Sequence, residues 1–363
     1  MATTVRDVAA LAGVSTATVS RALHGHPAIS AATRQRVEQA AEALGYVLAA
    51  TASDRARVAV VMPYLDRWYF SKVLDGVERA FAGKGIIVLI QRLQDLDERR
   101  RALLGDIPRR EADGVLLVNV QPAPDEAALL AERRIPLVLL GANLPGVHSV
   151  EIDDVAAARV ATAHLLEVGH RRIGLVSGRP FERVPFTVPP ERKRGFLLAL
   201  KDAGVGWDPN LEVNADFTAR GAQRVARALL GRADRPTAVF AASDEMAFGV
   251  IAAARALGLR VPEDLSVVGI DDHDLSECMG LTTVAQPVRT LGELAALQLA
   301  GLIAHHAQVR PAQRVIVPTL LVVRETTAPP QRVRSPSVSV RAEGAGAGAD
   351  DPIDAGFGGH ASG

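Results

Sequence analysis

From about Arg57 onward, short runs of apolar residues alternate with longer segments in which apolar residues recur every three or four positions. The continuous runs predict buried strands, and the amphipathic segments predict helices that cover them. The expected strands are 57–62, 86–90, 114–119, 136–140, 172–177, 237–241, 266–270 and 315–323. The expected helices are 71–83, 97–104, 124–133, 154–168, 191–203, 219–231, 244–257 and 288–307. Ser71 is the expected N-cap of the first of these helices.

This alternation predicts an α/β fold built from parallel, doubly wound sheets. The repeating units are too numerous for one small sheet, so we expect two lobes. Ligands of such folds bind beyond the carboxyl ends of the strands.

A different pattern occupies the N-terminal region. Residues 5–23 predict two short helices joined by a tight turn, and a third helix is expected over 31–44. Thr4 is expected to cap the first helix, Gly13 to supply the positive φ of the turn, and Ser15 to cap the second helix. Two helices joined in this way have the shape of a helix-turn-helix DNA-binding unit, although a plain three-helix bundle with a glycine corner is the alternative.

Apolar spacing decides which faces of these helices are buried. The expected apolar face of the first helix consists of Val8, Ala9 and Leu11, and that of the second consists of Val19 and Leu23. The second helix therefore turns its other side chains outward, where they can meet a major groove. These outward residues are Thr16, Ala17, Ser20 and Arg21.

These features resemble, in their order, the N-terminal signature of the LacI-type bacterial repressor family. The matching stretches are DVAALAGVS, TVSRAL and ISAATRQRVEQAAEALGY. Further stretches match later in the chain, among them HLLEVGHRRIGLVSG, RKRGFLLAL, AASDEMAFGVIAAARALGLRVPEDLSVVGIDD and LTTVAQP. The resemblance covers about residues 3 to 327 and implies a two-lobed, periplasmic-binding-protein-like effector core.

The resemblance also implies domain limits. They are a DNA-binding domain over 1–46, a shortened hinge over 47–57, an effector core over 58–327 and a tail over 328–363. One lobe is expected at about 58–168 and 287–317, and the other at about 169–286 and 318–327, with crossovers near Gly169, Gln286 and Pro318. The tail is rich in Gly, Ala and Ser, which predicts disorder.

Roles in DNA binding follow from the same resemblance. Thr16 and Ala17 occupy the positions that select the operator, and Arg21 occupies a position that contacts a base or the backbone. Ser15, Thr18, Ser20 and Thr33 are expected phosphate contacts, which position the protein rather than specify a sequence. His24 is expected to contact either bases or phosphates.

The expected hinge departs from the family pattern. It is about five residues shorter than is usual and lacks the Pro-Asn start of a helix that enters the minor groove. Leu48 is a candidate wedge in its place, or it packs against the third helix. A shortened hinge predicts looser tethering of the DNA-binding unit and weaker allosteric coupling.

Composition narrows the class of protein. The 363 residues are 48% hydrophobic, their formal net charge is zero, and Cys278 is the single cysteine. A lone cysteine forms no intrachain disulfide, and neither an export signal nor a membrane-spanning run is present, so we expect a cytoplasmic protein. The first fifty residues carry four arginines against three acids, a net charge of +1. Phosphate attraction is therefore modest, which favours a homodimer on a palindromic operator of double-stranded DNA.

Candidate chemistry points to a small-molecule site. Trp68, Tyr69 and Phe70 follow the first core strand, and three adjacent side chains cannot all face one core. We therefore expect at least one of them to line a cleft, where a ring can stack on a sugar; packing under the first core helix is the alternative. The family pattern adds Arg192, Phe217, Asp244 and Asp271 as effector contacts. This set favours a sugar or sugar derivative over a nucleobase.

Some of these acids have a second interpretation. Asp244 and Asp153 each stand at the start of an expected helix, where N-capping explains them equally well, and Asp272 is expected to turn a loop. No GxSxG or HExxH motif is present, so we expect neither an enzyme nor a cofactor or metal site. Two alternatives to an effector-controlled repressor remain. One is a sugar-binding protein of the transport type, and the other is a regulator whose short hinge impairs its coupling to DNA.

Overall fold

The computed structural model describes residues 4–23, 29–44, 55–93, 95–107, 112–178, 187–305 and 311–331. His24, Leu48, most of the expected hinge and all but the start of the expected tail lie outside these residues. Across the described part of the chain, none of the helices has both the length and the hydrophobicity needed to span a bilayer.

The N-terminal region forms three helices, α1 (Val5–Ala12), α2 (Thr16–Leu23) and α3 (Ala31–Ala43). The Asp7 carboxylate accepts from both the backbone N–H and the hydroxyl of Thr4, so the predicted first cap is present. Gly13 ends α1 with a φ of 67°, as the turn required. The Ser15 hydroxyl accepts from the backbone N–H of Thr18 and so caps α2.

Packing of the three helices corrects one prediction. Val8 and Ala9 of α1 are buried as expected, but Leu11 is 56% exposed and Ala12 is buried in its place. At about 100° per residue, Ala12 lies between the directions of Val8 and Ala9, whereas Leu11 lies beyond Val8 on the side away from Ala9, about 100° from Ala12. Val19 of α2 is fully buried, and Leu23 packs against the same small core.

The first lobe contains a parallel sheet with the strand order β11-β5-β4-β3-β1-β2. The strands are β1 (Arg57–Met62), β2 (Ile87–Arg92), β3 (Gly114–Val118), β4 (Leu137–Leu140), β5 (His148–Glu151) and β11 (Arg314–Ile316). Its helices are α4 (Trp68–Phe81), α5 (Leu96–Arg101), α7 (Pro124–Glu132) and α12 (Val288–Ala304), with a π-helical turn, η1 (Ala102–Asp106), after α5.

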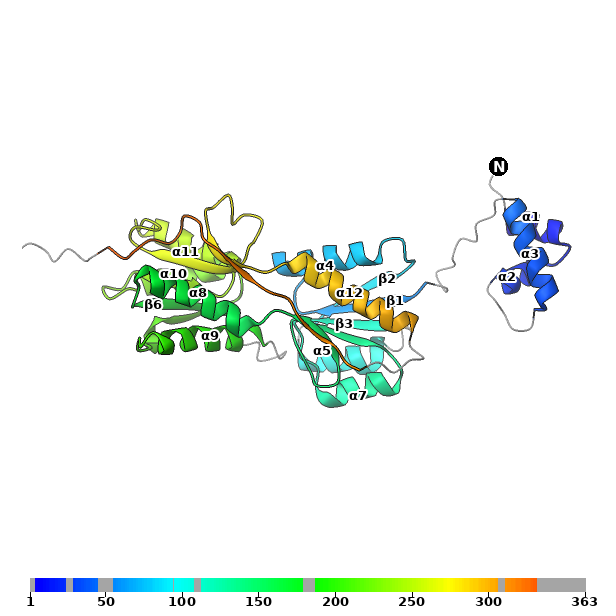
Figure 1. The fold of residues 1–363 in the computed structure, drawn as a ribbon, viewed down its shortest axis with the longest axis horizontal. Helices are drawn as coiled ribbons and strands as arrows, with labels where there is room; N and C mark the ends of the chain where they lie inside the picture. Colours follow the sequence, from blue (N-terminus) through cyan, green and yellow to red (C-terminus); the bar gives the residue numbers. More distant parts are fainter. Residues whose placement is uncertain are drawn as a thin grey trace, which may run out of the picture. The chain divides into compact units, whose positions relative to one another are not determined.

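Both faces of this sheet are buried, as its continuous apolar strands require. Val58 and Val60 of β1 belong to the core under α4 and α12, whereas Ala59 and Val61 belong to the core on the other face, with residues of η1 and α7. Figure 1 shows α4 beside α12, and the two helices pack closely together.

The second lobe repeats this arrangement with the strand order β12-β10-β9-β8-β6-β7. The strands are β6 (Ile173–Gly178), β7 (Glu212–Ala215), β8 (Ala238–Ala241), β9 (Ser266–Asp271), β10 (Thr282–Ala285) and β12 (Leu320–Val322), which runs antiparallel to β10. The helices α8 (Asp154–Val168) and α9 (Val188–Asp202) pack together, as do α10 (Ala219–Leu230) and α11 (Asp244–Ala256), and a short 3-10 turn, η2 (Pro209–Leu211), precedes β7.

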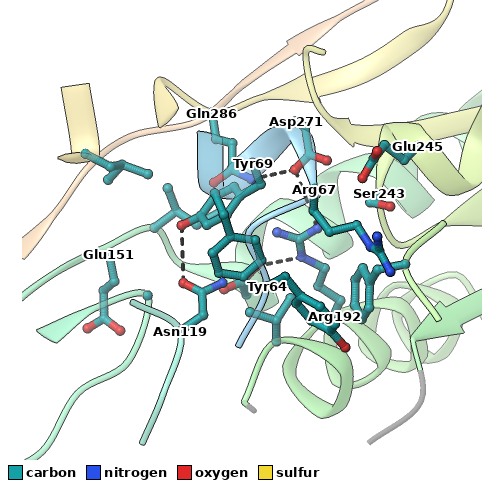
Figure 2. A pocket seen from close by; sticks show the side chains of 17 residues that line it. Tyr64, Arg67, Tyr69, Asn119, Glu151, Arg192, Ser243, Glu245, Asp271 and Gln286 are labelled. Carbon is teal, nitrogen blue, oxygen red and sulfur yellow. Dashed lines mark hydrogen bonds and ion pairs between the residues drawn. The ribbon is translucent and has the colours of Figure 1, made fainter. Parts of the chain in front are cut away.

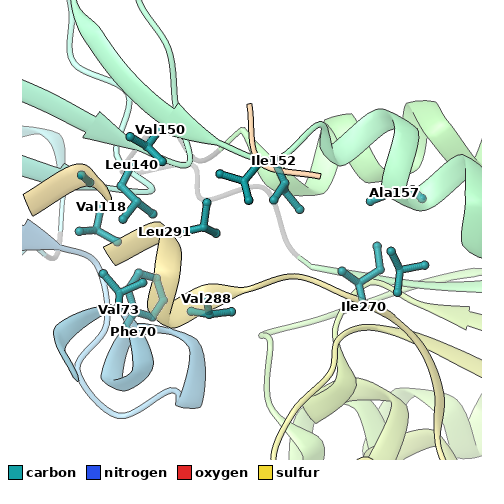
Figure 3. Close-up of a cluster of buried hydrophobic side chains, with 14 of the residues drawn as sticks. Phe70, Val73, Val118, Leu140, Val150, Ile152, Ala157, Ile270, Val288 and Leu291 are labelled. Carbon is teal, nitrogen blue, oxygen red and sulfur yellow. The ribbon is translucent and has the colours of Figure 1, made fainter. Parts of the chain in front are cut away.

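The hydrophobic core continues from one lobe to the other. In Figure 3 side chains of α4, α12, β3 and β4 gather together, and Ile152 lies between this group and Ala157 and Ile270 of the second lobe. The two-lobed, doubly wound fold that the hydrophobic pattern predicts is therefore the fold of the core.

Four details of the sequence prediction are wrong. Helix α4 begins at Trp68 rather than Ser71, whose hydroxyl instead donates to the Trp68 carbonyl. The strand expected over 315–323 is two strands, β11 and β12, in different sheets. Strands β5, β7 and β10 were not expected, because they are short and carry polar residues. Helix α8 packs against α9, β9 and β10 of the second lobe, so the first crossover precedes α8, near Ile152, rather than following it near Gly169.

Candidate functional site

A pocket lies at the carboxyl ends of the strands of both sheets, where the fold predicted a ligand site. Its empty space, counted together with the open solvent at its mouth, is about 610 Å³. Its lining comprises Tyr64, Arg67, Tyr69, Phe70, Asn119, Gly141, Glu151, Ile152, Asp154, Val188, Arg192, Phe217, Ser243, Glu245, Asp271, Gln286 and Leu291. Both lobes therefore contribute to one site (Figure 2).

Aromatic rings form much of this lining. Tyr69 and Phe70, from the first turn of α4, line the pocket as the sequence predicted, and Phe217 lines it from the second lobe. Trp68 does not line the pocket; its ring lies 4.7 Å from the ring of His273. Helical geometry explains the split, because consecutive residues point about 100° apart.

Tyr64 completes the aromatic set and was missed by the sequence analysis. It stands two residues after the end of β1, at the edge where the fold places ligands, and its ring lies 5.6 Å from that of Phe70. The Arg67 guanidinium lies 5.1 Å from the centre of the Tyr64 ring, a cation–π distance. A search for aromatic residues immediately after predicted strands would have found Tyr64.

Arg192 is the central residue of the part of the pocket wall that the second lobe provides. It is 5% exposed, its Nε donates to Asp154 Oδ1 at 2.6 Å, and its Nη1 donates to the Ala242 carbonyl. The same Nη1 lies 3.9 Å from Asp271 Oδ1. This guanidinium therefore holds α8, α9 and two strand ends in place around the pocket.

Asp271 ends β9 and lines the pocket. Gln286 Nε2 donates to its Oδ1 at 2.6 Å, and the backbone N–H of Asp244 points to its Oδ2 at 3.4 Å. Burial raises the pKa of Asp271 to about 8; the charge of Asp244 adds to the rise, and the charge of Arg192 opposes it. Burial thus leaves the charged form of this carboxyl group poorly solvated, and Arg192 offsets only part of that cost.

The amide of Asn119 is held at the first lobe's strand ends. Its Oδ1 accepts from the Tyr69 hydroxyl at 3.3 Å, and its backbone has a φ of 53°. Gly141 stands beside it, and a Cβ there would lie only 2.0 Å from Asn119 Oδ1. Positive φ values also occur at Phe217 (54°) and Asp271 (142°), so backbone strain gathers at the pocket.

Asp244 is not in the pocket lining and is not the N-cap of α11. That cap is Ser243, whose hydroxyl accepts from the Met246 N–H. The Asp244 carboxylate is fully buried and accepts from Thr283 Oγ1 at 2.6 Å, Ser276 Oγ at 2.7 Å and the His273 N–H at 3.0 Å. It therefore fixes the loop between β9 and β10 rather than facing a ligand.

The two remaining ambiguous acids have structural roles. Asp153 caps α8, because its Oδ1 accepts from the Ala156 N–H. Asp272 has a φ of 56° in the loop after β9 and pairs with Arg324 at 2.7 Å. Neither residue lines the pocket, so the capping and loop-turning interpretations are the better ones.

Four charged residues of the lining were not predicted, one of them Asp154, the partner of Arg192. Arg67 Nη1 donates to Asp66 at 2.7 Å. Glu151 accepts from Arg314 and from Asn143. Glu245 accepts from the Trp68 backbone N–H, and burial raises its pKa while Arg67 opposes the rise. Glu151 ends β5, a strand that the pattern did not reveal, so its position had no detectable signal.

The N-terminal region presents a second candidate surface on α2. Thr16, Ala17, Ser20 and Arg21 are exposed, as a reading face requires, whereas Val19 is buried. The hydroxyls of Ser15 and Thr18 lie 2.8 Å apart, and those of Ser30 and Thr33 lie 2.9 Å apart. The predicted phosphate contacts thus include one such pair, Ser15 with Thr18, and the Thr33 hydroxyl of the second pair, all at helix N-termini, where backbone N–H groups favour anions.

Comparisons with known proteins decide the family. The pattern described as "Bacterial regulatory proteins, lacI family" matches residues 4–48, and that of a "Periplasmic binding protein-like domain" matches residues 162–327. The transcriptional repressor CytR of Escherichia coli strain K12 is 36% identical over 311 residues, which cover 82% of this chain and 89% of CytR. The chain belongs to the LacI family of bacterial regulatory proteins.

Solved LacI-family structures share the fold. The complex of the regulator CelR with cellobiose is 33% identical, with a TM-score of 0.66 over 90% of this chain and 100% of that one. The lac repressor dimer bound to operator and the anti-inducer ONPF is 26% identical, with a TM-score of 0.73 over the same shares. The present chain is accordingly a DNA-binding transcriptional regulator under the control of a small-molecule effector.

Proposed function

We propose that this LacI-family regulator binds an uncharged, hydroxyl-rich effector, a sugar or sugar derivative, in the pocket between its lobes. The observation that carries the proposal is the lining itself, in which four aromatic rings accompany a ring of amide, carboxylate and guanidinium groups. Aromatic faces stack on the apolar face of a sugar ring, and fixed polar groups bind its hydroxyls.

The charges of the lining favour a neutral ligand. Among the described residues, two arginines face four acids, and each guanidinium already has an acidic partner, Asp154 for Arg192 and Asp66 for Arg67. A phosphorylated ligand would place two negative charges where acids outnumber bases, at a high electrostatic cost. Hydroxyl groups can donate to these carboxylates without that cost.

The relatives support the same class of ligand. The similar CelR structure contains cellobiose. By this proposal Tyr69, Phe70 and Phe217 supply stacking faces, and Arg192 and Asp271 bind hydroxyls. Trp68 and Asp244 act indirectly, because neither lines the pocket.

The proposal for DNA is a homodimer on a palindromic operator, as in the operator-bound lac repressor dimer. Thr16, Ala17 and Arg21 would contact base edges, and Ser15, Thr18, Ser20 and Thr33 would contact phosphates. The DNA-binding domain would span 1–46 and the effector core 58–327. Such a regulator acts where the chromosome lies, in the cytoplasm, and performs no catalysis.

Two measurements test this proposal together. Selection from fragmented genomic DNA should yield duplexes that the purified protein prefers over random sequence, with affinity that falls as salt rises. Thermal shift should then find stabilisation by neutral sugars such as cellobiose, and none by sugar phosphates or purines. A shift with purines alone would overturn the sugar, and no sequence preference at any salt would overturn the regulator.

A matched pair of variants assigns any sugar effect to the pocket. Arg192→Lys removes the two-pronged donor set, so the sugar-induced shift should be lost or strongly reduced. Arg159→Lys alters an exposed arginine of α8 that pairs with Asp202, and its sugar response should match that of the wild type.

A further inference from the structure

We propose that Trp68 and Lys72 of the first lobe and His273 and Asp274 of the second form an inter-lobe clasp whose closure sets the affinity of the pocket. These four residues lie outside the pocket lining. They are positioning residues, because they act on the effector through neighbours that do line it. The inference rests on the proposed effector site but is carried by contacts of its own.

The clasp joins two kinds of contact at one place. The Trp68 and His273 rings lie 4.7 Å apart with 31° between their planes, which is a stacking distance. One turn along α4, Lys72 Nζ pairs with Asp274 Oδ2 at 2.7 Å. The same ammonium lies 5.9 Å from the centre of the Trp68 ring, so the ion pair and the stack form a single cluster.

On the first lobe the clasp is continuous with the pocket. Trp68 immediately precedes Tyr69 and Phe70, whose rings line the site. The Trp68 backbone N–H donates to the carboxylate of Glu245, a pocket residue of α11 in the second lobe. Movement of the first turn of α4 therefore displaces stacking faces and an inter-lobe hydrogen bond at once.

On the second lobe the clasp leads to Asp271 through fixed contacts. The His273 N–H donates to Asp244 Oδ2 at 3.0 Å, and the Asp244 N–H points to Asp271 Oδ2 at 3.4 Å. The imidazole is held in place by the edge of Phe248 at 5.4 Å and by the Leu275 N–H, which donates to its Nδ1 at 3.0 Å. The ring is thus a rigid docking face for Trp68 rather than a mobile side chain.

These contacts matter because a pocket made by two lobes is complete only when both are in place. If the closed arrangement is populated less often, the apparent affinity for an effector falls by the same fraction. Loss of one aromatic stack and one ion pair is expected to weaken binding by roughly three- to tenfold. No residue that lines the pocket need change.

Trp68 itself reports on the clasp. The chain has two tryptophans, and Trp207 packs in the second lobe against Phe196, so Trp207→Phe leaves Trp68 as the single emitter. In that background we expect His273→Ala with Asp274→Asn to expose Trp68 to acrylamide, with a quenching constant about twofold higher. His273→Phe keeps a flat ring beside Trp68 and should restore low quenching.

Asp202→Asn is the matched control. It removes an exposed ion pair, Arg159 with Asp202, that joins α8 to α9 within one lobe. It should leave Trp68 quenching unchanged. Unfolding midpoints of all variants, measured by circular dichroism, should agree within a few degrees, because the clasp joins the lobes rather than supporting either core.

Cellobiose serves as the effector probe. Its dissociation constant, measured by calorimetry, should rise roughly three- to tenfold in the clasp variant and recover in His273→Phe. Equal Trp68 quenching with and without the clasp residues would overturn the inference, as would altered quenching with unaltered affinity. If cellobiose fails to bind the wild type, the effector proposal loses that sugar, and the same affinity comparison is made with the neutral sugar that stabilises the wild type most in the thermal-shift screen.

Discussion

Burial opposes ionisation of three carboxyl groups in the pocket, those of Asp154, Glu245 and Asp271. It raises the pKa of each, although Arg192 opposes the rise at Asp154 and Arg67 opposes it at Glu245. Such groups cost stability when they are charged, and proteins retain them where a ligand makes use of them. Under the proposed function, the effector is the ligand that would make use of these three groups.

The pKa of about 8 at Asp271 gives a pH-dependent prediction. In the unfolded chain this carboxyl ionises near its ordinary pKa of 3.8, whereas in the folded protein it keeps its proton until about pH 8. The free energy of unfolding should therefore fall as pH rises between these values. Asp271→Asn removes this loss, so its melting temperature relative to wild type should increase from pH 5 to pH 9. The exposed Asp202→Asn should show no such trend.

Gly178 gives a second prediction at the same scale. A Cβ at Gly178 would lie 1.7 Å from Cε2 of Phe217, whose ring covers the end of β6. Gly178→Ala should displace this ring, abolish the sugar-induced thermal shift and destabilise the fold by about 1–3 kcal/mol. Gly206→Ala is the control, because a Cβ there meets nothing within 4 Å. Wild-type sugar binding by Gly178→Ala would show that Phe217 is not a stacking face.

Among single residues, sequence reasoning found aromatic residues after the first core strand and residues that the family pattern marks. Tyr69, Phe70, Arg192, Phe217 and Asp271 all line the pocket. It could not tell that Trp68 lies outside the lining while Tyr69 and Phe70 lie in it, because the direction of each side chain depends on the residue at which α4 begins. It also could not reveal that the Asp244 carboxylate accepts from two donors of the loop after β9 and from Thr283 of β10.

At the scale of elements, a histidine fastens the segment that follows β12. His170 is 1% exposed; its Nε2 lies 3.0 Å from the Ala328 carbonyl, and its Nδ1 lies 2.9 Å from Thr237 Oγ1. Burial lowers the pKa of His170, and the hydrogen bond to Ala328 opposes this shift. The neutral ring is therefore the form that docks the segment.

The sign of the resulting pH effect follows from the lowered pKa. The stabilising effect of the neutral ring is complete above the ordinary pKa of 6.5 and is lost as pH falls through the lower, folded-state pKa. Hydrogen exchange at the backbone amides of residues 326–328 should accelerate below about pH 6, beyond the intrinsic change for unfolded peptide. His170→Gln cannot take up a proton, so its protection should not vary with pH in this window.

Element prediction succeeded where hydrophobic periodicity was long and uninterrupted. Helices α8, α10 and α11 begin at the predicted residues, and β1 matches at both ends. Strands β5, β7 and β10 were not predicted, because each spans four residues and contains polar side chains. In β10, for example, Thr282 and Thr283 have hydrogen-bond partners from elsewhere in the chain. Pairing with a neighbour, not local sequence, makes these segments strands.

For the whole molecule, DNA selectivity and DNA affinity should be separable. Thr16 is exposed on α2, whereas Thr33 lies in the first turn of α3 with its hydroxyl on Ser30. Thr16→Ala should change which sequences emerge from genomic selection, while Thr33→Ala should weaken binding to all duplexes alike. Identical selected sequences for wild type and Thr16→Ala would remove Thr16 from the reading face.

The order of strands in the first sheet has a consequence for synthesis on the ribosome. Strand β11 and helix α12, which cover an edge and a face of that sheet, come from residues beyond Pro287, after nearly all of the second lobe. Apolar strand residues of the first sheet in a nascent chain therefore stay partly exposed to solvent until the second lobe has been synthesised. A chain truncated before α12 should therefore aggregate through the exposed apolar surface of the first lobe. The same surface is where we expect a chaperone to bind the nascent chain.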